Sequence, residues 1–209
     1  MFSLLTNGGP FMLVILLVSI IALALFVERA AFLYFRMKLN MDNAYKKILH
    51  PLEKSNYRGA IEECSKIHKH PMGSILKAGL LKADSKDKDI VRAMEEKLLS
   101  EVPRVKARVN MLTLFANIST LLGLLGTIMG LITAFKGVTS ASDAMKQEIL
   151  AKGISMAMLT TAAGLVVAIP CLVGYYILNN RSDYLIDKME EKALGMANLL
   201  SSLKHQEQV

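Results

Sequence analysis

Threonines recur every seven residues in one uncharged stretch of the chain. Thr113, Thr120 and Thr127 share a face if this stretch is a helix. A second uncharged stretch holds the adjacent pair Thr160 and Thr161. Because a hydroxyl both donates and accepts hydrogen bonds, such a row can hold a file of water or help to coordinate an ion. The same hydroxyls can instead bond back to their own helix. Composition alone does not choose between a polar lining and plain helix packing.

Small residues run beside these threonines. Ala116, Gly123 and Gly130 form a parallel row, and Ala157 and Gly164 lie in the second stretch. Small residues let membrane helices approach each other closely. We therefore expect Gly123, Gly130, Ala157 and Gly164 to pack against the helices of a partner.

The elements that carry these residues are long and apolar. Residues 1–27, 109–135 and 153–180 contain no Asp, Glu, Lys or Arg, although 21% of the chain is charged. Each span exceeds the roughly 20 apolar residues that a membrane-crossing helix needs. None alternates apolar and polar residues as barrel strands do. These patterns exclude a soluble enzyme and a secreted domain, and they disfavour a β-barrel.

The positive charge is concentrated in one segment. Residues 36–108 hold 17 of the 25 Lys and Arg, against 10 Asp and Glu. The positive-inside rule places this segment in the cytoplasm, which puts the N-terminus in the periplasm and returns the C-terminus to the cytoplasm. A basic cytoplasmic segment suits anionic membrane lipids. It carries no nucleic-acid motif, so we expect no nucleic-acid partner.

Together these patterns predict an all-α integral membrane protein with three transmembrane helices and long helices extending into the cytoplasm. The predicted segments are an N-terminal segment with helix 1 (1–36), a cytoplasmic helical domain (37–108), helix 2 (109–135), a periplasmic connection (136–152), helix 3 (153–180) and a cytoplasmic C-terminal helix (181–209). The first span itself is expected over about 11–34.

In the cytoplasmic domain, apolar spacing predicts a helix over 57–67 that breaks at His70-Pro71. A further helix begins near Asp87, and Pro103 is expected to kink it. One alternative is that this helix runs straight into the second span.

The deep parts of the spans contain no charged or catalytic group. These parts contain no Asp, Glu, Lys, Arg or His, and Glu28 lies too close to the inner boundary to carry protons alone. A proton pathway needs a titratable group, so the carrier carboxylate must come from another chain. The spans hold no nucleophile–base pair, and Cys64 and Cys171 fall in different compartments. We therefore expect no enzyme activity, catalytic residue, metal, cofactor or disulfide.

Two long motifs resemble a known family. Residues 122–135, LGLLGTIMGLITAF, resemble the LLGLLGTVxGMIxAF signature of the MotA/TolQ/ExbB proton-channel family. Residues 153–170, GISMAMLTTAAGLVVAIP, are similar to its third-helix pattern GIxxALxTTAxGLxxAIP. Three spans match the ExbB/TolQ-like branch, since the MotA branch has four.

The resemblance implies a molecular motor in the bacterial inner membrane. Such proteins form a homo-oligomeric ring, usually a pentamer, around paired helices of an ExbD- or TolR-like single-span partner that carries a membrane Asp. Proton-motive force drives protons past this Asp, and the work passes to a TonB- or TolA-like effector. The spans' lack of a carboxylate agrees with this arrangement. We expect helices two and three to line the pore and the first helix to face lipid.

The resemblance also suggests ion-pathway residues. Thr127 and Thr161 match the threonines that face the partner's Asp, Thr160 is a neighbour, and Thr120 lies one heptad before Thr127. Met156 stands where ExbB and TolQ commonly carry a Glu, so that Glu's role does not transfer.

Other functions stay open at this point. One is a structural membrane scaffold without ion conduction of its own, and another is a Na⁺-driven motor subunit. The energised process is also open among import of siderophores or vitamins, outer-membrane integrity, gliding and polymer secretion.

Overall fold

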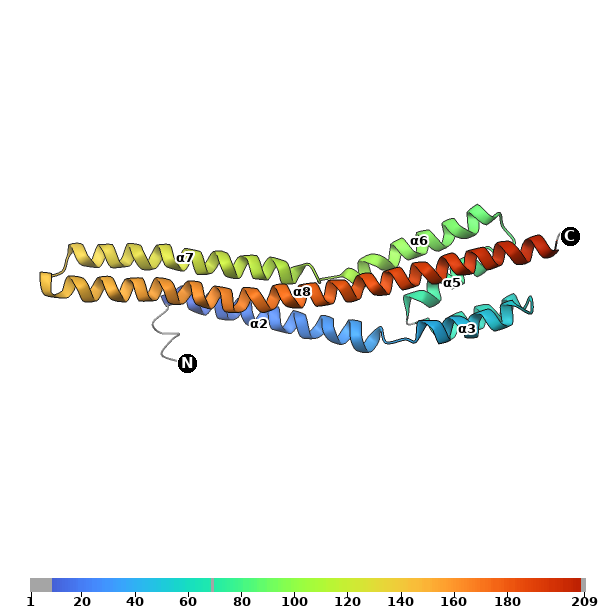
Figure 1. The fold of residues 1–209 in the computed structure, drawn as a ribbon, viewed down its shortest axis with the longest axis horizontal. Coiled ribbons are helices and arrows are strands. Elements are labelled where there is room, and N and C mark those ends of the chain that lie inside the picture. Colours follow the sequence, from blue (N-terminus) through green and yellow to red (C-terminus); the bar gives the residue numbers. More distant parts are fainter. Residues whose placement is uncertain (1–8, 69, 208–209) are drawn as a thin grey trace. The chain divides into compact units, whose positions relative to one another are not determined.

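The chain folds into helices joined by short turns (Figure 1). The computed structural model describes residues 9–68 and 70–207, and no strand occurs among them. The elements are α2 (Gly9–Ala31), the π-helix η1 (Phe32–Arg36), α3 (Met41–Leu52), α4 (Tyr57–Lys66), α5 (Pro71–Leu80), α6 (Asp87–Lys106), α7 (Met111–Thr139) and α8 (Asp143–Glu207). The predicted all-α fold is confirmed.

Three of the helical stretches are long and apolar enough to cross a membrane. They include α2, α7 and the first part of α8. The chain divides into two compact units. We call residues 9–30 and 108–178 the apolar unit, because it holds the three spans. Residues 31–107 and 179–207 form the polar unit.

The helix ends differ from the sequence-based expectation at both sides of the spans. The first span was expected to reach residue 34, but α2 ends at Ala31 and passes into one π-helical turn. At the other side, α7 continues to Thr139 and α8 begins at Asp143. Most of the predicted connection 136–152 is therefore helical. Its Lys, Glu, Gln and Ala residues are strong helix formers.

The chain breaks between α6 and α7. Ala107 is extended, with ψ 136°, and Arg108 has a positive φ of 58°. A non-glycine residue rarely adopts a positive φ, and neither conformation continues a helical hydrogen-bond ladder. The alternative of one helix running from the cytoplasmic domain into the second span is therefore wrong. Pro103 lies inside α6, as expected.

The polar unit has a core of large apolar side chains. The fully buried side chains of this core include Ile48, Leu52, Leu76, Met94 and Met189. The predicted helix start after the His70-Pro71 break is confirmed, because α5 begins at Pro71. The Nδ1 atom of His70 accepts a hydrogen bond from the Met72 N–H at 3.2 Å and so caps this helix.

Candidate functional site

The small residues of α7 face those of α8 within a single chain. A Cβ atom on Gly130 would lie 3.1 Å from the Cβ of Ala157, and one on Gly123 would lie 3.1 Å from the Thr160 carbonyl oxygen. On Gly164, a Cβ would lie 2.6 Å from a backbone oxygen of α7. Gly123, Gly130, Ala157 and Gly164 were expected to pack against a partner's helices, because one chain seemed unable to cover them. The structure shows that the two rows cover each other within one chain. Their packing against a partner's helices stays a prediction.

Thr160 belongs to the same contact. Its side chain is fully buried, and a Cβ on Gly126 would lie 2.6 Å from the Thr160 Cβ. Its hydroxyl donates to the Ala157 carbonyl at 2.8 Å, one turn back along α8. In this chain the Thr160 side chain fills the space that Gly126 leaves. Its assignment to the ion pathway stays a prediction.

Sequence reasoning missed two residues of this contact. Ser119 is fully buried, and its hydroxyl donates across the helices to the Gly164 carbonyl at 3.1 Å. Gly126 receives Thr160, as described above. The buried positions of α7 include Ala116, Ser119, Gly123, Gly126 and Gly130. Their alternating spacing of three and four defines one helix face. A search for heptads alone finds only every second member of this row.

Thr161 and Thr127 lie at the edge of this contact. The Thr161 hydroxyl is 3.4 Å from the Gly123 carbonyl oxygen, which is a long hydrogen bond. Thr127 is one turn after Gly123 on α7, so the two threonines follow the same edge. The Thr127 hydroxyl donates to the Leu124 carbonyl at 2.6 Å. The oxygen of this hydroxyl still has lone pairs that can accept a hydrogen bond from another donor.

Thr120 lies seven residues before Thr127, on the same face of α7. It is exposed, and its hydroxyl donates to the Ala116 carbonyl at 3.1 Å. We call Thr120, Thr127 and Thr161 the threonine edge. Met156 is half-buried, and its carbonyl oxygen accepts from the Thr160 hydroxyl at 3.2 Å. The role of these residues in an ion pathway stays a prediction.

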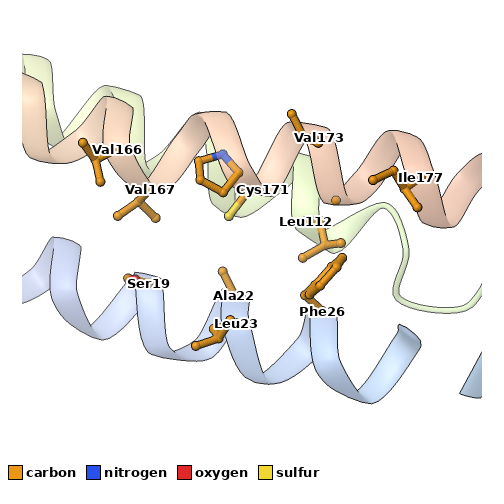
Figure 2. A pocket seen from close by; sticks show the side chains of 12 residues that line it. Ser19, Ala22, Leu23, Phe26, Leu112, Val166, Val167, Cys171, Val173 and Ile177 are labelled. Carbon is orange, nitrogen blue, oxygen red and sulfur yellow. The ribbon is translucent and has the colours of Figure 1, made fainter. Parts of the chain in front are cut away.

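α2 packs on the other side of α8. A Cβ on Gly174 would lie 2.8 Å from the Phe26 ring, so the two helices approach closely there. Beside this contact lies a cavity of about 340 Å³, lined by apolar side chains of α2 and α8 and by Leu112 of α7, with the Ser19 hydroxyl as a polar exception (Figure 2). Pro170, which lines it, is nine residues from Thr161. Nine residues are two and a half helical turns, so Thr161 lies on the side of α8 away from this cavity.

The charged groups of the apolar unit lie at the ends of its spans. Glu28 of α2 accepts hydrogen bonds from Arg108 at 2.8 and 3.1 Å, and Arg29 lies 3.8 Å from the same carboxylate. Glu28 is therefore neutralised by two arginines. Residues 111–135 and 153–178 contain no Asp, Glu, Lys, Arg or His. These two spans thus offer hydroxyls and carbonyls but no carboxylate. Over residues 9–68 and 70–207, no three His, Cys, Asp or Glu side chains gather as metal ligands do.

Comparison with models of protein families shows the family to which this chain belongs. The model of the MotA/TolQ/ExbB proton channel family matches residues 67–191, more than half of the 209 residues. The chain belongs to this family. The match contains all of α5, α6 and α7 and most of α8, so the threonine edge and the small-residue contact both lie inside it. No curated protein is significantly similar to the chain. Membership in the MotA/TolQ/ExbB family makes this a proton-channel-type membrane protein.

Proposed function

We propose that the chain is the ring-forming subunit of a proton-driven motor. In this proposal, the threonine edge borders the proton path, and a single-span partner of the ExbD/TolR type supplies the titratable carboxylate. The observation that carries the proposal is the position of Thr127 and Thr161. The Thr161 hydroxyl reaches the Gly123 carbonyl of α7 at 3.4 Å, and Thr127 lies one helical turn after Gly123. Thr161 lies on the side of α8 away from the cavity that α2 lines. A hydroxyl at that edge can bond to a carboxylate that alternately holds and releases a proton.

The need for a partner follows from the chemistry of the spans. Moving one elementary charge across 100 mV supplies about 2.3 kcal/mol, but a proton must rest on a titratable group on the way. The α7 and α8 spans have no carboxylate, and Glu28 is already paired with Arg108. An Asp on a partner's helix would complete the path. The long Thr161 hydrogen bond leaves its hydroxyl free to turn toward that Asp.

A ring is the assembly that we propose, most simply a pentamer. Large apolar residues of α7 point away from the contact with α8: Leu121, Leu124 and Phe135 are each more than half exposed in the single chain. Further copies and the partner's helices would cover much of this surface. α2 would lie on the outside of the ring, against lipid, with the periplasmic N-terminus and cytoplasmic C-terminus that the positive-inside rule favours.

The rest of the motor is proposed from the family. A TonB- or TolA-like effector would receive the work, and the system would sit in the bacterial inner membrane. A Na⁺-driven motor is the second candidate, because a threonine hydroxyl can also help to coordinate Na⁺. A scaffold without conduction is the third. The observation in its favour is that the small residues already pack within the chain.

Isolation of the assembled complex tests this proposal. The chain is expressed with a single-span protein of the ExbD/TolR type that carries a membrane Asp, the complex is purified in mild detergent, and native mass spectrometry gives the stoichiometry. We expect several copies of this chain with two copies of the partner. Monomers alone, both with and without the partner, would contradict the ring.

A further inference from the structure

Arg181 is the first charged residue after the third span, and two tyrosine rings hold it in place. Its guanidinium carbon lies 5.4 Å from the ring centroid of Tyr34 and 5.4 Å from that of Tyr184. All three residues belong to the polar unit. A guanidinium stacked against aromatic faces loses little further freedom when it binds an anion, since its planar fork is already oriented.

The Arg181 guanidinium finds no anion within the described chain. Its Nε atom is buried without a hydrogen-bond partner, and no carboxylate of the described residues pairs with it. The nearest acidic residue in sequence, Asp183, is engaged elsewhere. It pairs with Lys106 at 2.7 Å and accepts from Asn179 at 2.8 Å. Other cations of the polar unit do have such partners, as Lys192 has in Asp42.

The surroundings of Arg181 indicate a lipid. Tyr34 and Tyr184 are 45% and 52% exposed, and Phe35 is 80% exposed. Exposed aromatic rings next to a membrane span are typical of the level of the lipid headgroups. Uncharged residues 153–180 end immediately before Arg181, which places its cation at the same level. The anion available at that level is a lipid phosphate.

We propose that Arg181, held between Tyr34 and Tyr184, binds the phosphate group of an anionic phospholipid at the cytoplasmic face of the membrane. The guanidinium donates paired N–H bonds to the phosphate oxygens. The tyrosine rings keep it from turning toward bulk water. This site does not depend on ion conduction, so its test is separate from that of the proposed motor.

A lipid titration tests the site. The detergent-solubilised protein, assembled as isolated, is titrated with phosphatidylglycerol or phosphatidylcholine, and native mass spectrometry counts the lipids bound. We expect tighter binding of phosphatidylglycerol, and Arg181→Gln to weaken that binding by about tenfold, the lower end of what a charged hydrogen bond supports. Tyr34→Leu should weaken it in the same direction, and Tyr34→Phe should retain it because the ring face remains.

Control measurements separate a lipid site from the other possible roles of Arg181. Arg58→Gln removes an exposed cation of α4 and should leave phosphatidylglycerol binding unchanged. Millimolar inorganic phosphate should not displace the lipid, because the acyl chains contribute to binding; complete displacement would overturn a lipid site. The proposal is also overturned if Arg181→Gln binds phosphatidylglycerol like the wild type. A change in oligomeric mass in this variant, with unaltered lipid binding, would instead assign Arg181 to contact with another copy.

Discussion

Gly126 of α7 lies directly against Thr160 of α8, so close that a Cβ on the glycine would stand 2.6 Å from the Cβ of the threonine. Real Cβ atoms do not approach a neighbour to this distance. The absence of a side chain at Gly126 therefore allows the two helices to meet. In turn, Thr160 fills the space and bonds to its own helix at the Ala157 carbonyl. Within this chain Thr160 is thus part of the close α7–α8 contact.

A larger residue at Gly126 should separate α7 from α8. Overpacking of a closely packed contact costs about 1–3 kcal/mol. We expect Gly126→Val to lower the thermal unfolding midpoint in detergent. The matched control is Leu125→Val, one position earlier and 43% exposed, which should change the midpoint little. Equal midpoints for both variants would contradict the close contact.

Removing the hydroxyls of the threonine edge should impair transport while leaving the assembly intact. Thr161→Val keeps the side-chain shape and removes a hydrogen bond to a partner's carboxylate. Such a bond to a charged group is worth about 1.5–3 kcal/mol, which corresponds to a roughly 10- to 100-fold slower proton transfer. Thr127→Val should act in the same direction. The measurement is work driven by proton-motive force in cells, taken together with the amount of assembled complex.

Thr133 is the control for these variants. It lies on α7, is exposed, and donates to the Met129 carbonyl at 2.8 Å, as Thr127 does to its own helix. Its position six residues after Thr127 places it on a different face. Thr133→Val and Met156→Ala should retain most activity. Full activity of Thr161→Val, combined with loss in Met156→Ala while the complex persists, would place Met156 in the pathway instead.

Acidification should destabilise the polar unit through His70. Burial lowers the pKa of this imidazole to about 4, against the opposing effects of the Met37 backbone and the Glu101 carboxylate. The unfolded chain, with a His pKa of about 6.5, binds a proton that the folded chain refuses between these values. The stability is thus fully present above about pH 6.5 and is lost progressively down to about pH 4. The loss reaches about 3 kcal/mol at most.

His70→Asn isolates this effect, because Asn keeps an acceptor for the α5 cap and does not titrate. Urea unfolding is measured between pH 4 and 7.5 for both proteins. The variant should show a flatter dependence of stability on pH than the wild type. If the two slopes coincide, His70 is not the group responsible.

The orientation of the chain predicts which residues can be labelled from outside. In a background without Cys64 and Cys171, a cysteine replacing Ser142 should react with an impermeant thiol reagent in spheroplasts. One replacing Ser85 should react only after lysis. The opposite pattern would reverse the topology and remove the basis for the proposed ring.

The structural features that could be predicted from the sequence are those that depend on local residue patterns. The three spans, the α5 start at Pro71 and the helical tail follow from hydropathy, proline position and apolar spacing. The sequence did not predict which faces of α7 and α8 meet. Thr160 and Thr161 are adjacent and chemically identical, yet only Thr160 is fully buried in the helix contact, while Thr161 reaches the Gly123 carbonyl from its edge. That choice depends on the crossing of two helices far apart in sequence, and so does the Ser119 bond to Gly164. The break at Arg108 was equally hidden, since no glycine marks its positive φ.

Proton flux into liposomes tests the central claim most directly, namely that this chain forms the pathway and a partner supplies its carboxylate. The chain is reconstituted alone and with the single-span partner, and a pH-sensitive dye inside the vesicles follows proton entry under an imposed potential. We predict flux only with the partner, lost when the partner's membrane Asp becomes Asn and reduced by Thr161→Val. Equal flux from the chain alone, or flux unaffected by loss of the partner's Asp, would contradict this account.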